Sequence, residues 1–466
     1  MSAPDRVDEA LTATASHTLA ELSEWVRIPS VASDPSRTLE VVRSAHWLAG
    51  RMRAAGMATE LYSTGDTLAV YGEWLVDPGR PTVLVYSHHD VRHAKPEEWQ
   101  ETDPFTPVFR DGRLYGRGAS DAKGQVIAHL WGLQAHLLAT DRDEPAVNLK
   151  FLVEGEEENG SPHLSALLDE HQDRLACDVI VFSDTIQWKE QSPAMVTSLR
   201  GMVSATLTVT GPSRDVHSGV ASGAVVNPLQ ALSELLGALH DDDGRIRLPG
   251  FYDSVAPPTD ERRQELADLP FDGETWVDRT ETRHITGEAG FTVPERLWLR
   301  PSLEILSLLA GDPEGIARAV VPSKAEATIN IRTVPDQRVE AVARQLRAFV
   351  DAQLRDTASY EVEVDEETGQ EPYLTPHGPL LDALDRALAA GFGVPSVGRM
   401  GNAGGGPAAL LSTALGCPVL FLGTGLPEDH WHSSDESLDL EMLRAGAATI
   451  AHLWHELSSM SAGDLS

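Results

Sequence analysis

The sequence predicts an α/β fold in which a mostly parallel sheet carries helices on both faces and a smaller α+β domain interrupts the chain. Helical and β-rich segments alternate up to about residue 194, and an antiparallel type of alternation then takes over until the first pattern returns near residue 372. The length of 466 residues suits two or three domains. We therefore expect residues 1–194 and 372–466 to form one discontinuous domain, with residues 195–371 inserted into it.

The expected main domain is built from alternating helices and strands. Apolar residues recur at helical spacing in four segments: 8–28, 39–55, 123–139 and 163–176. β-rich runs lie between or after them: 67–75, 82–87, 148–155 and 178–184. Near the end of the chain, a helix is expected at 380–390 and a buried strand within 417–425. In a parallel sheet of this kind, sites form just beyond the carboxyl ends of the strands.

The expected inserted domain is a small α+β sandwich. Residues 196–211 alternate like antiparallel strands, and residues 227–240 have helical spacing. A polar, proline-rich region at 241–301 predicts an elaborated loop with short helices. The segments that follow alternate strand, helix and strand: 324–335, 339–354 and 359–367.

Charge and cysteine content exclude several classes of protein. The 71 acidic residues outnumber the 37 basic ones, which argues against nucleic acid or anionic lipid as a partner. Cys177 and Cys417 both lie in apolar surroundings, so neither a disulfide framework nor a cysteine metal site is expected. The first residues show no secretory signal pattern, and no apolar window predicts a membrane span. These features together lead us to expect a cytoplasmic protein.

Four predicted strands of the main domain run out into residues of the kind that bind metals or move protons, and a fifth segment of this kind precedes a helix. The segments concerned are His88-His89-Asp90, the run EGEEENGS at 154–161, Asp184, the loop LPEDHWHSSDES at 426–437, and Asp121 just before a helix. Imidazole and carboxylate ligands without cysteine suit zinc, cobalt or manganese at a hydrolytic site. Asp90 follows His88 by two residues, so it should lie on the same face and accept the spare N–H of that imidazole.

Five motifs in order, SHHDV, GRGASDAKG, EGEEENGS, FSD and HSSDES, resemble the di-zinc metallopeptidase family of carnosinase-type dipeptidases, aminoacylases and glutamate carboxypeptidases. The resemblance spans essentially the whole chain, including the DVHSG segment of the inserted domain. It implies a catalytic domain with two metal ions, and an inserted lid domain that usually carries a homodimer contact.

The resemblance also implies a role for each residue of the motifs. The implied metal ligands are His88 and Asp184 on one ion, Glu158 and His432 on the other, and Asp121 between both. Glu157 would be the general base, Asp90 would orient His88, and Glu156 would be an ordinary acid. Zinc is the expected metal, and manganese or cobalt would accept the same ligands.

Three further residues are implied to contact the substrate. His217 matches a histidine that reaches across the dimer into the partner's active site, where it would stabilise the oxyanion. Arg332 matches a lid-domain arginine suited to a substrate carboxylate. Arg399, with the loop 402–407, would help to hold the peptide backbone. Here the chain departs from the family, because RMGNAGGGP is two residues longer than the Arg-Glu-Gly-Gly-Ser-Ile-Pro run of carnosinase-like members.

The site residues fit more than one function. A peptidase acting on dipeptides or at a peptide C-terminus is the reading favoured by the long 241–301 insertion. An N-acyl-amino-acid deacylase would use the same site. A peptide-binding protein without catalysis would have lost its base or a ligand, whereas Glu157, Asp90 and Asp121 are all present. A serine hydrolase is disfavoured because no Gly-x-Ser-x-Gly elbow occurs.

Overall fold

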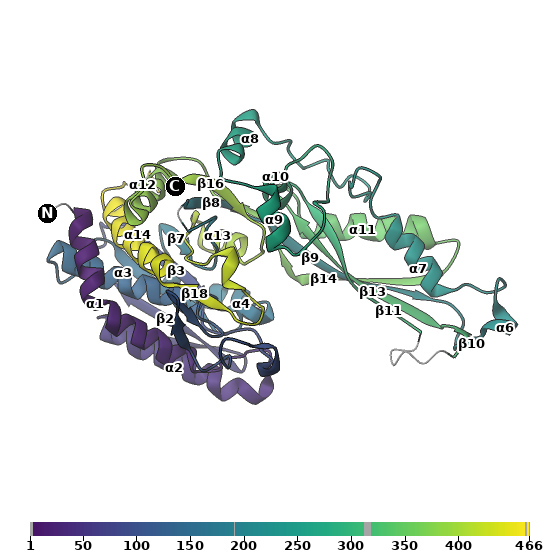
Figure 1. The fold of residues 1–466 in the computed structure, drawn as a ribbon, viewed down its shortest axis with the longest axis horizontal. Helices are drawn as coiled ribbons and strands as arrows, with labels where there is room; N and C mark the ends of the chain where they lie inside the picture. Colours follow the sequence, from purple (N-terminus) through teal and green to yellow (C-terminus); the bar gives the residue numbers. More distant parts are fainter. Residues whose placement is uncertain (1–2, 191, 312–317, 462–463, 466) are drawn as a thin grey trace. The chain divides into compact units, whose positions relative to one another are not determined.

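The computed structural model describes residues 3–190, 192–311, 318–461 and 464–465, and the chain divides into two compact units (Figure 1). The first unit comprises Met1–Thr197, Thr375–Met400 and Leu410–Ser466. The second comprises Ser198–Leu374 and the short segment Gly401–Ala409. The glycine-rich segment therefore groups with the second unit, although it is flanked on both sides by chain of the first.

A mixed six-stranded sheet forms the centre of the first unit, in the order β1-β2-β6-β3-β7-β17. Its strands are β1 Ala58–Thr64, β2 Thr67–Trp74, β3 Thr82–His88, β6 Asn148–Glu154, β7 Val179–Phe182 and β17 Val419–Phe421. The neighbours β6, β3, β7 and β17 run parallel, whereas β1 and β2 form an antiparallel hairpin beside β6. The loop that joins β2 to β3 is short, whereas two parallel strands of one sheet must be joined by a longer crossover. This explains why β2 runs antiparallel to β3. The predicted α/β class is confirmed.

Helices cover both faces of this sheet. One face packs against α1 Ala3–Val26, α2 Thr38–Ala54, α3 Lys123–Thr140, α12 Pro379–Phe392 and α14 Leu440–Ser458 (Figure 1). Val83 and Val85 point to this side, so the alternating Tyr86 points to the other, where it stacks on Phe182. The segment with α4 Leu164–Glu170 and α5 Gln172–Leu175 lies on that second face, since Lys150 of β6 donates to its carbonyls.

The helix α3 is buried along most of its length, which is what a helix that is apolar on all sides requires. It packs between α1 and α14 under the sheet. Within it, His129 is fully buried, with its Nε2 2.9 Å from the Ser183 Oγ and its Nδ1 without a hydrogen-bond partner. Burial lowers the pKa of His129 from 6.5 to about 3.

The buried His129 should make the stability of the protein depend on pH. Between the two pKa values the unfolded chain binds a proton here and the folded chain does not, so stability is lost as the pH falls below about 6.5. By this linkage the free energy of unfolding should drop by about 2 kcal/mol between pH 7.5 and pH 5. The variant His129→Gln keeps an N–H donor but has no group that titrates in this range. We therefore expect its free energy of unfolding, measured in urea, to fall by about 2 kcal/mol less than that of the wild type over the same pH interval. The exposed His46→Gln should behave as the wild type, and equal pH dependence in all three proteins would refute the assignment.

The second unit is a four-stranded antiparallel sheet with helices on one face. Its strands, in the order β11-β13-β9-β14, are Ser302–Ala310, Lys324–Thr333, Gly201–Thr210 and Ser359–Gln370. Alternate residues of β9 and β13 pack beneath α7 Pro228–Gly237 and α11 Val339–Leu354, so the remaining residues, including Arg332, lie on the opposite face. The strand β11 was not predicted. It lies at the sheet edge with most of its residues exposed, which leaves no clear alternation to detect.

The region between α7 and β11 contains short helices, as predicted. These are α8 Asp260–Ala267, α9 Gly273–Arg279 and α10 Val293–Trp298. Thr259, Asp272 and Thr292 cap their first turns by accepting backbone N–H groups. The buried Glu288 receives two hydrogen bonds of 2.8 Å from Arg300, which anchors this long connection.

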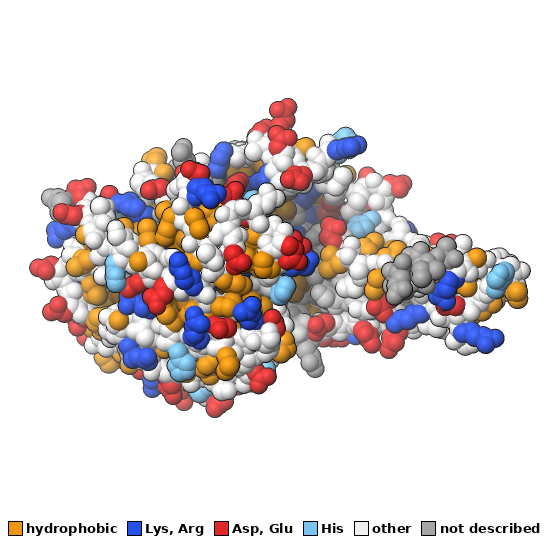
Figure 2. All heavy atoms as spheres, turned by 60° about the horizontal axis from the view of Figure 1, so that its bottom comes forward, with side chains coloured by type: hydrophobic (Ala, Val, Ile, Leu, Met, Phe, Trp, Pro, Cys, Tyr) orange, Lys and Arg blue, Asp and Glu red, His pale blue; other side chains and the backbone are white. Residues whose placement is uncertain are grey.

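Short strands complete the architecture. Three small sheets consist of β18-β5-β4 (Ser437–Asp439, Arg113–Tyr115 and Val108–Arg110), β15-β8-β16 (Tyr373–Leu374, Ala194–Leu199 and Gly398–Asn402) and β10-β12 (Val216–His217 and Val320–Val321). The helix α13 Ala408–Leu415 precedes β17. Figure 2 shows acidic side chains spread over the visible face with basic ones among them. None of the described helices is long and apolar enough to cross a membrane.

Candidate metal centre

The first cluster of candidate ligands consists of His88, Asp121 and Asp184. His88 ends β3, Asp184 follows the neighbouring strand β7, and Asp121 precedes α3, so the carboxyl ends of parallel strands bring them together. The His88 Nε2 lies 3.2 Å from Asp121 Oδ1 and 3.7 Å from Asp184 Oδ1. His88 and Asp121 are buried, and only 10% of the Asp184 side chain is exposed.

The second cluster consists of Asp121, Glu158 and His432. The His432 Nε2 lies 2.9 Å from Asp121 Oδ2 and 3.2 Å from Glu158 Oε2. The ligand atoms of each cluster lie within 4.8 Å of one another. Asp121 belongs to both clusters and turns one carboxylate oxygen toward each, which is the arrangement of a carboxylate that bridges two ions.

The donor set fits two divalent ions. Glu158 Oε1 is buried without a partner, whereas Glu158 Oε2 lies 2.7 Å from Arg92 Nε and Asp121 Oδ2 lies 2.9 Å from His432 Nε2. Buried acceptors that lack donors are costly unless a cation satisfies them. Nitrogen and oxygen ligands without sulfur suit zinc, manganese and cobalt.

Charge–charge interactions perturb these groups strongly. Burial lowers the pKa of His432, but its hydrogen bonds to Asp121 and Glu158 outweigh that effect and raise the pKa to about 10. Burial and the charge of Asp121 raise the pKa of Glu158 to about 7. Each cluster thus concentrates negative charge beside an imidazole, so a divalent ion would compete with protons for the same atoms.

The general-base candidate Glu157 lies in the same turn but belongs to neither cluster. Its residue is half-buried, and burial together with the charge of Asp184 raises its pKa well above the ordinary value. Glu156, by contrast, accepts hydrogen bonds from His163, with Nδ1 at 2.9 Å. The three consecutive glutamates therefore have three different environments.

Asp90 holds two parts of the site together. Its main-chain carbonyl lies 3.0 Å from His88 Nδ1, whereas its Oδ1 is 3.4 Å away, so the carbonyl rather than the expected carboxylate fixes the imidazole. The Asp90 carboxylate instead accepts the backbone N–H groups of Glu157 and Glu158, at 3.2 Å and 3.0 Å. The end of β3 is thereby tied to the glutamate turn that follows β6.

Glu436 is a buried carboxylate beside the candidate ligand Asp121 that the sequence reasoning missed. Its fully buried carboxylate accepts backbone N–H groups of Gly118, Ser120 and Asp121 at 3.0–3.1 Å. It also pairs with Arg117 Nη1 at 2.8 Å. Glu436 lies four residues after His432, within the HSSDES motif, so its place in that motif was the available signal.

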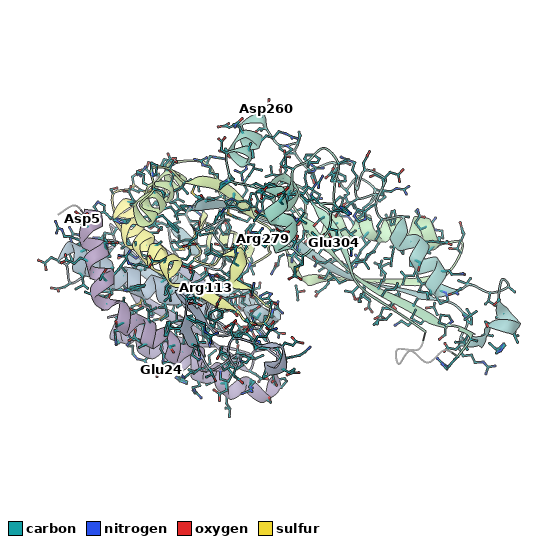
Figure 3. The ribbon with its side chains drawn as sticks, in the orientation of Figure 1. Asp5, Glu24, Arg113, Asp260, Arg279 and Glu304 are labelled. Carbon is teal, nitrogen blue, oxygen red and sulfur yellow. The ribbon has the colours of Figure 1, made fainter. Side chains whose placement is uncertain are left out.

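A second buried carboxylate supports the same loop. Asp429 accepts the Ser120 hydroxyl at 2.6 Å and pairs with Arg113, which is labelled in Figure 3. Trp431 donates its indole N–H to the same Ser120 hydroxyl at 2.8 Å. The loop that carries His432 is thus fixed against the loop that carries Asp121.

Replacing Glu436 by glutamine should weaken metal binding. The amide nitrogen cannot accept the backbone N–H groups that the carboxylate holds, so the Asp121 loop should lose its fixed position. We expect metal affinity to fall by about 10- to 100-fold, measured by competition with a chromogenic chelator. The exposed Glu441→Gln is the control and should bind metal as the wild type does. Unchanged affinity in Glu436→Gln would contradict this positioning role.

The three predicted substrate-binding residues lie in different places. His217 is exposed in β10, and Arg332 is half-buried in β13, where burial lowers the pKa of its guanidinium. A Cβ on Gly405 would come within 3.0 Å of Arg332 Nη1, so the glycine permits this close approach. Arg399 is half-buried in β16, and its charge acts on Asp385.

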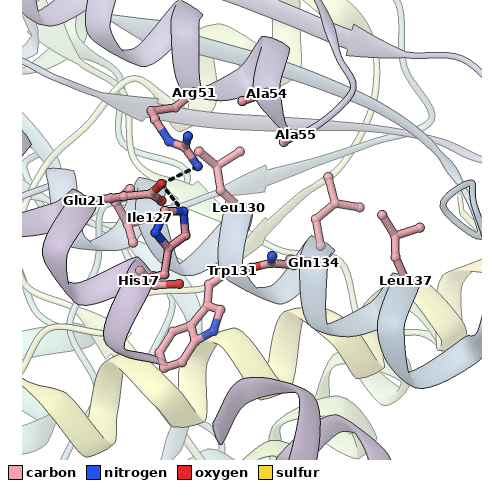
Figure 4. Close-up of a pocket in the computed structure, with 12 residues that line it drawn as sticks. His17, Glu21, Arg51, Ala54, Ala55, Ile127, Leu130, Trp131, Gln134 and Leu137 are labelled. Atoms are coloured by element: carbon pink, nitrogen blue, oxygen red, sulfur yellow. Dashed lines mark ion pairs between the residues drawn. The ribbon is translucent and has the colours of Figure 1, made fainter. Parts of the chain in front are cut away.

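A cavity of about 390 Å³ lies between α1, α2 and α3 (Figure 4). In it, Glu21 pairs with His17 and with Arg51, both at 2.7 Å. None of the predicted site residues lines this cavity.

The comparisons with known proteins identify the family. A family model described as "Peptidase family M20/M25/M40" matches residues 84–456. The chain therefore belongs to this family of metallopeptidases. This confirms the resemblance inferred from the five motifs.

Several relatives match along nearly the whole chain. The chain is 29% identical to the Beta-Ala-His dipeptidase of Rattus norvegicus over 459 residues, covering 95% of this chain and 93% of the relative. It is 29% identical to the Cys-Gly metallodipeptidase dug1 of Schizosaccharomyces pombe over 479 residues, covering 98% and 99%.

Solved structures share the fold. The Saccharomyces cerevisiae di-peptidase Dug1p has a TM-score of 0.85 at 26% identity, covering 99% of this chain and 100% of that one. Human carnosine dipeptidase 1 has a TM-score of 0.83 at 27% identity, with the same coverage.

Proposed function

We propose that this enzyme hydrolyses dipeptides with two divalent metal ions, zinc being the favoured metal. The single observation that carries the proposal is Asp121, whose two oxygens face two separate ligand clusters beside the unligated Glu157. The relatives that cover nearly the whole chain are named dipeptidases, and so are the two solved structures. These names support dipeptides over N-acyl amino acids as the substrate class.

The proposed mechanism assigns proton transfer to Glu157. When bound, the two ions would supply a water of lowered pKa and would polarise the scissile carbonyl. Glu157 would take a proton from the attacking water and deliver it to the leaving amine. Its burial and the charge of Asp184 raise its pKa, so the Glu157 carboxylate is a stronger base toward the proton of the water than an exposed glutamate would be. Asp90 would hold the turn of Glu157 and the imidazole of His88 in fixed positions relative to each other, because it hydrogen-bonds to both.

The proposed substrate contacts come from three other residues. Arg332 would pair with the substrate carboxylate, because its guanidinium is partly desolvated and a planar fork suits that group. His217 would donate to the oxyanion in the active site of a second copy. Arg399 would help to hold the peptide backbone. The second unit would then be the lid, and the first the catalytic domain.

The substrate class can be tested on the purified protein. We would assay β-Ala-His, Cys-Gly, a hexapeptide and N-acetyl amino acids after chelation and again after zinc or manganese is restored. We expect metal-dependent cleavage of the dipeptides alone. Cleavage of only the N-acetyl amino acids would make the enzyme a deacylase, and inactivity of a metal-loaded protein on every substrate would favour a binding role.

We also propose a homodimer that buries β11. This edge strand pairs only with β13 among the described residues, and its Ile305, Leu306, Leu308 and Leu309 are 45–63% exposed. An apolar strand edge without a hydrogen-bonded neighbour tends to pair with another chain, and a second copy would cover it.

We also propose a cytoplasmic location, which is supported by the two free thiols.

Placing a charge on β11 should separate the proposed dimer. Leu306→Asp would put a carboxylate into the buried interface, and we expect sedimentation velocity to show monomers. Because His217 is proposed to serve the partner's site, the monomer should also lose most of its activity. Leu39→Asp, at a residue that is 81% exposed on α2, is the control and should stay dimeric. A dimeric and active Leu306→Asp would exclude this interface.

A further inference from the structure

The two cysteines of the chain lie side by side at the edge of the main sheet. The Sγ atoms of Cys177 and Cys417 are 3.3 Å apart, although 240 residues separate them in sequence. Each precedes one of two neighbouring parallel strands, β7 and β17, so both lie at the amino ends of these strands. The candidate metal ligands lie at the carboxyl ends. The thiol pair and the metal centre therefore lie at opposite ends of the strands of this sheet.

The backbone geometry suits a disulfide between them. Val419 lies opposite Ile180, and continuing this register places Cys417 opposite Asp178, next to Cys177. Strand spacing and rise then put the two Cα atoms about 6 Å apart on the diagonal. This separation is within the range that disulfides span. A small rotation of the side chains is enough to bring the sulfurs together.

Hydrogen bonds hold the flanking loops in place. Lys150 donates to the carbonyls of Arg174 and Ala176 at 2.7 Å, which fixes the turn before Cys177. Ser412 donates to the Cys417 carbonyl at 2.8 Å. Neither thiol needs a large backbone movement to meet the other.

The thiols are distinct in exposure and acidity. Cys177 is half-buried, whereas Cys417 is buried with 7% of its surface exposed. The contact between the two Sγ atoms lowers the pKa of Cys417 and raises the pKa of Cys177. Cys417 is thus the better thiolate, with Cys177 positioned to react next.

We propose that Cys177 and Cys417 form a reversible disulfide when the enzyme meets hydrogen peroxide, a modification site apart from the metal centre. The Cys417 thiolate attacks one peroxide oxygen: an S–O bond forms, the O–O bond breaks and hydroxide leaves as water. The Cys177 sulfur then attacks the sulfenic sulfur: the S–S bond forms, the S–O bond breaks and a second water leaves. Two thiols are oxidised and one peroxide is reduced to two waters. A dithiol such as dithiothreitol reverses the change by exchange.

The disulfide should stabilise the first unit without disturbing the metal ligands. It would close a covalent loop of 240 residues and so restrict the unfolded chain. We expect the Tm to rise by about 5 °C or more, and dipeptide hydrolysis to stay near its reduced level.

The test uses the zinc-loaded enzyme with graded hydrogen peroxide. We expect both thiols to disappear together, the peptides around Cys177 and Cys417 to be joined with the loss of two hydrogens, and the Tm rise to be reversed by dithiothreitol. The wild type should lose its thiols about tenfold faster than Cys417→Ser loses Cys177, because oxidation starts at the Cys417 thiolate, whereas Cys177→Ser should oxidise at Cys417 without forming an internal disulfide. The chain has two cysteines, so an intermolecular disulfide would link two chains. A non-reducing gel distinguishes the two cases, because only the intermolecular bond doubles the apparent mass.

Three results would overturn the proposal. These are independent oxidation of the thiols to sulfinic acids, a crosslink between two chains, or thiols that survive peroxide unchanged. If either serine variant fails to fold, peptide mapping of the wild type still decides the question.

Discussion

Glu157→Gln should lower kcat for dipeptide hydrolysis by about 10³-fold while leaving bound metal unchanged. The amide has nearly the shape of the carboxylate but cannot take a proton. Glu157 also belongs to neither ligand cluster, so its loss should not release an ion. Steady-state kinetics together with metal analysis of the same preparation would measure both effects.

The neighbouring glutamate provides the matched control. Glu156 pairs with His163, so Glu156→Gln should change kcat only a few-fold. A large loss in both variants would mean that the turn as a whole had moved. Full activity in Glu157→Gln would remove Glu157 from the mechanism.

Asp121→Asn should abolish activity through the loss of both ions. An amide offers one neutral oxygen, whereas the carboxylate turns one oxygen to each cluster. We expect metal analysis of dialysed protein to show less than about a tenth of the wild-type content. Asp184 and His432 each belong to one cluster, so Asp184→Asn and His432→Ala should retain more metal than Asp121→Asn. Equal metal content in all three variants would argue against a shared ligand.

The fold was largely predictable because its elements are locally encoded. The helix expected at 123–139 is observed as Lys123–Thr140, and the strand expected at 82–87 as Thr82–His88. Among the strands that were not predicted, β11 has apolar side chains that face solvent in the isolated chain. Its pattern depends on what covers it, and a single sequence does not carry that information.

The candidate site was predictable where residues follow strands directly. His88 and Asp184 follow neighbouring parallel strands, and the sheet itself brings them together. Glu436 could not be placed in this way, because its partner Asp121 is 315 residues distant in sequence. The role of the Asp90 carbonyl depends on a turn after β3 rather than on spacing. Contacts made by loops therefore needed the structure.

The central claim is that this chain is a dipeptidase with two ions sharing Asp121, and one titration tests it most directly. Zinc would be added stepwise to the metal-free enzyme while dipeptide hydrolysis is followed. The two-cluster site predicts that activity rises until two equivalents per chain have bound and then stays constant. Activity that is complete at one equivalent, or absent at every loading of a folded, metal-bound protein, would contradict the account.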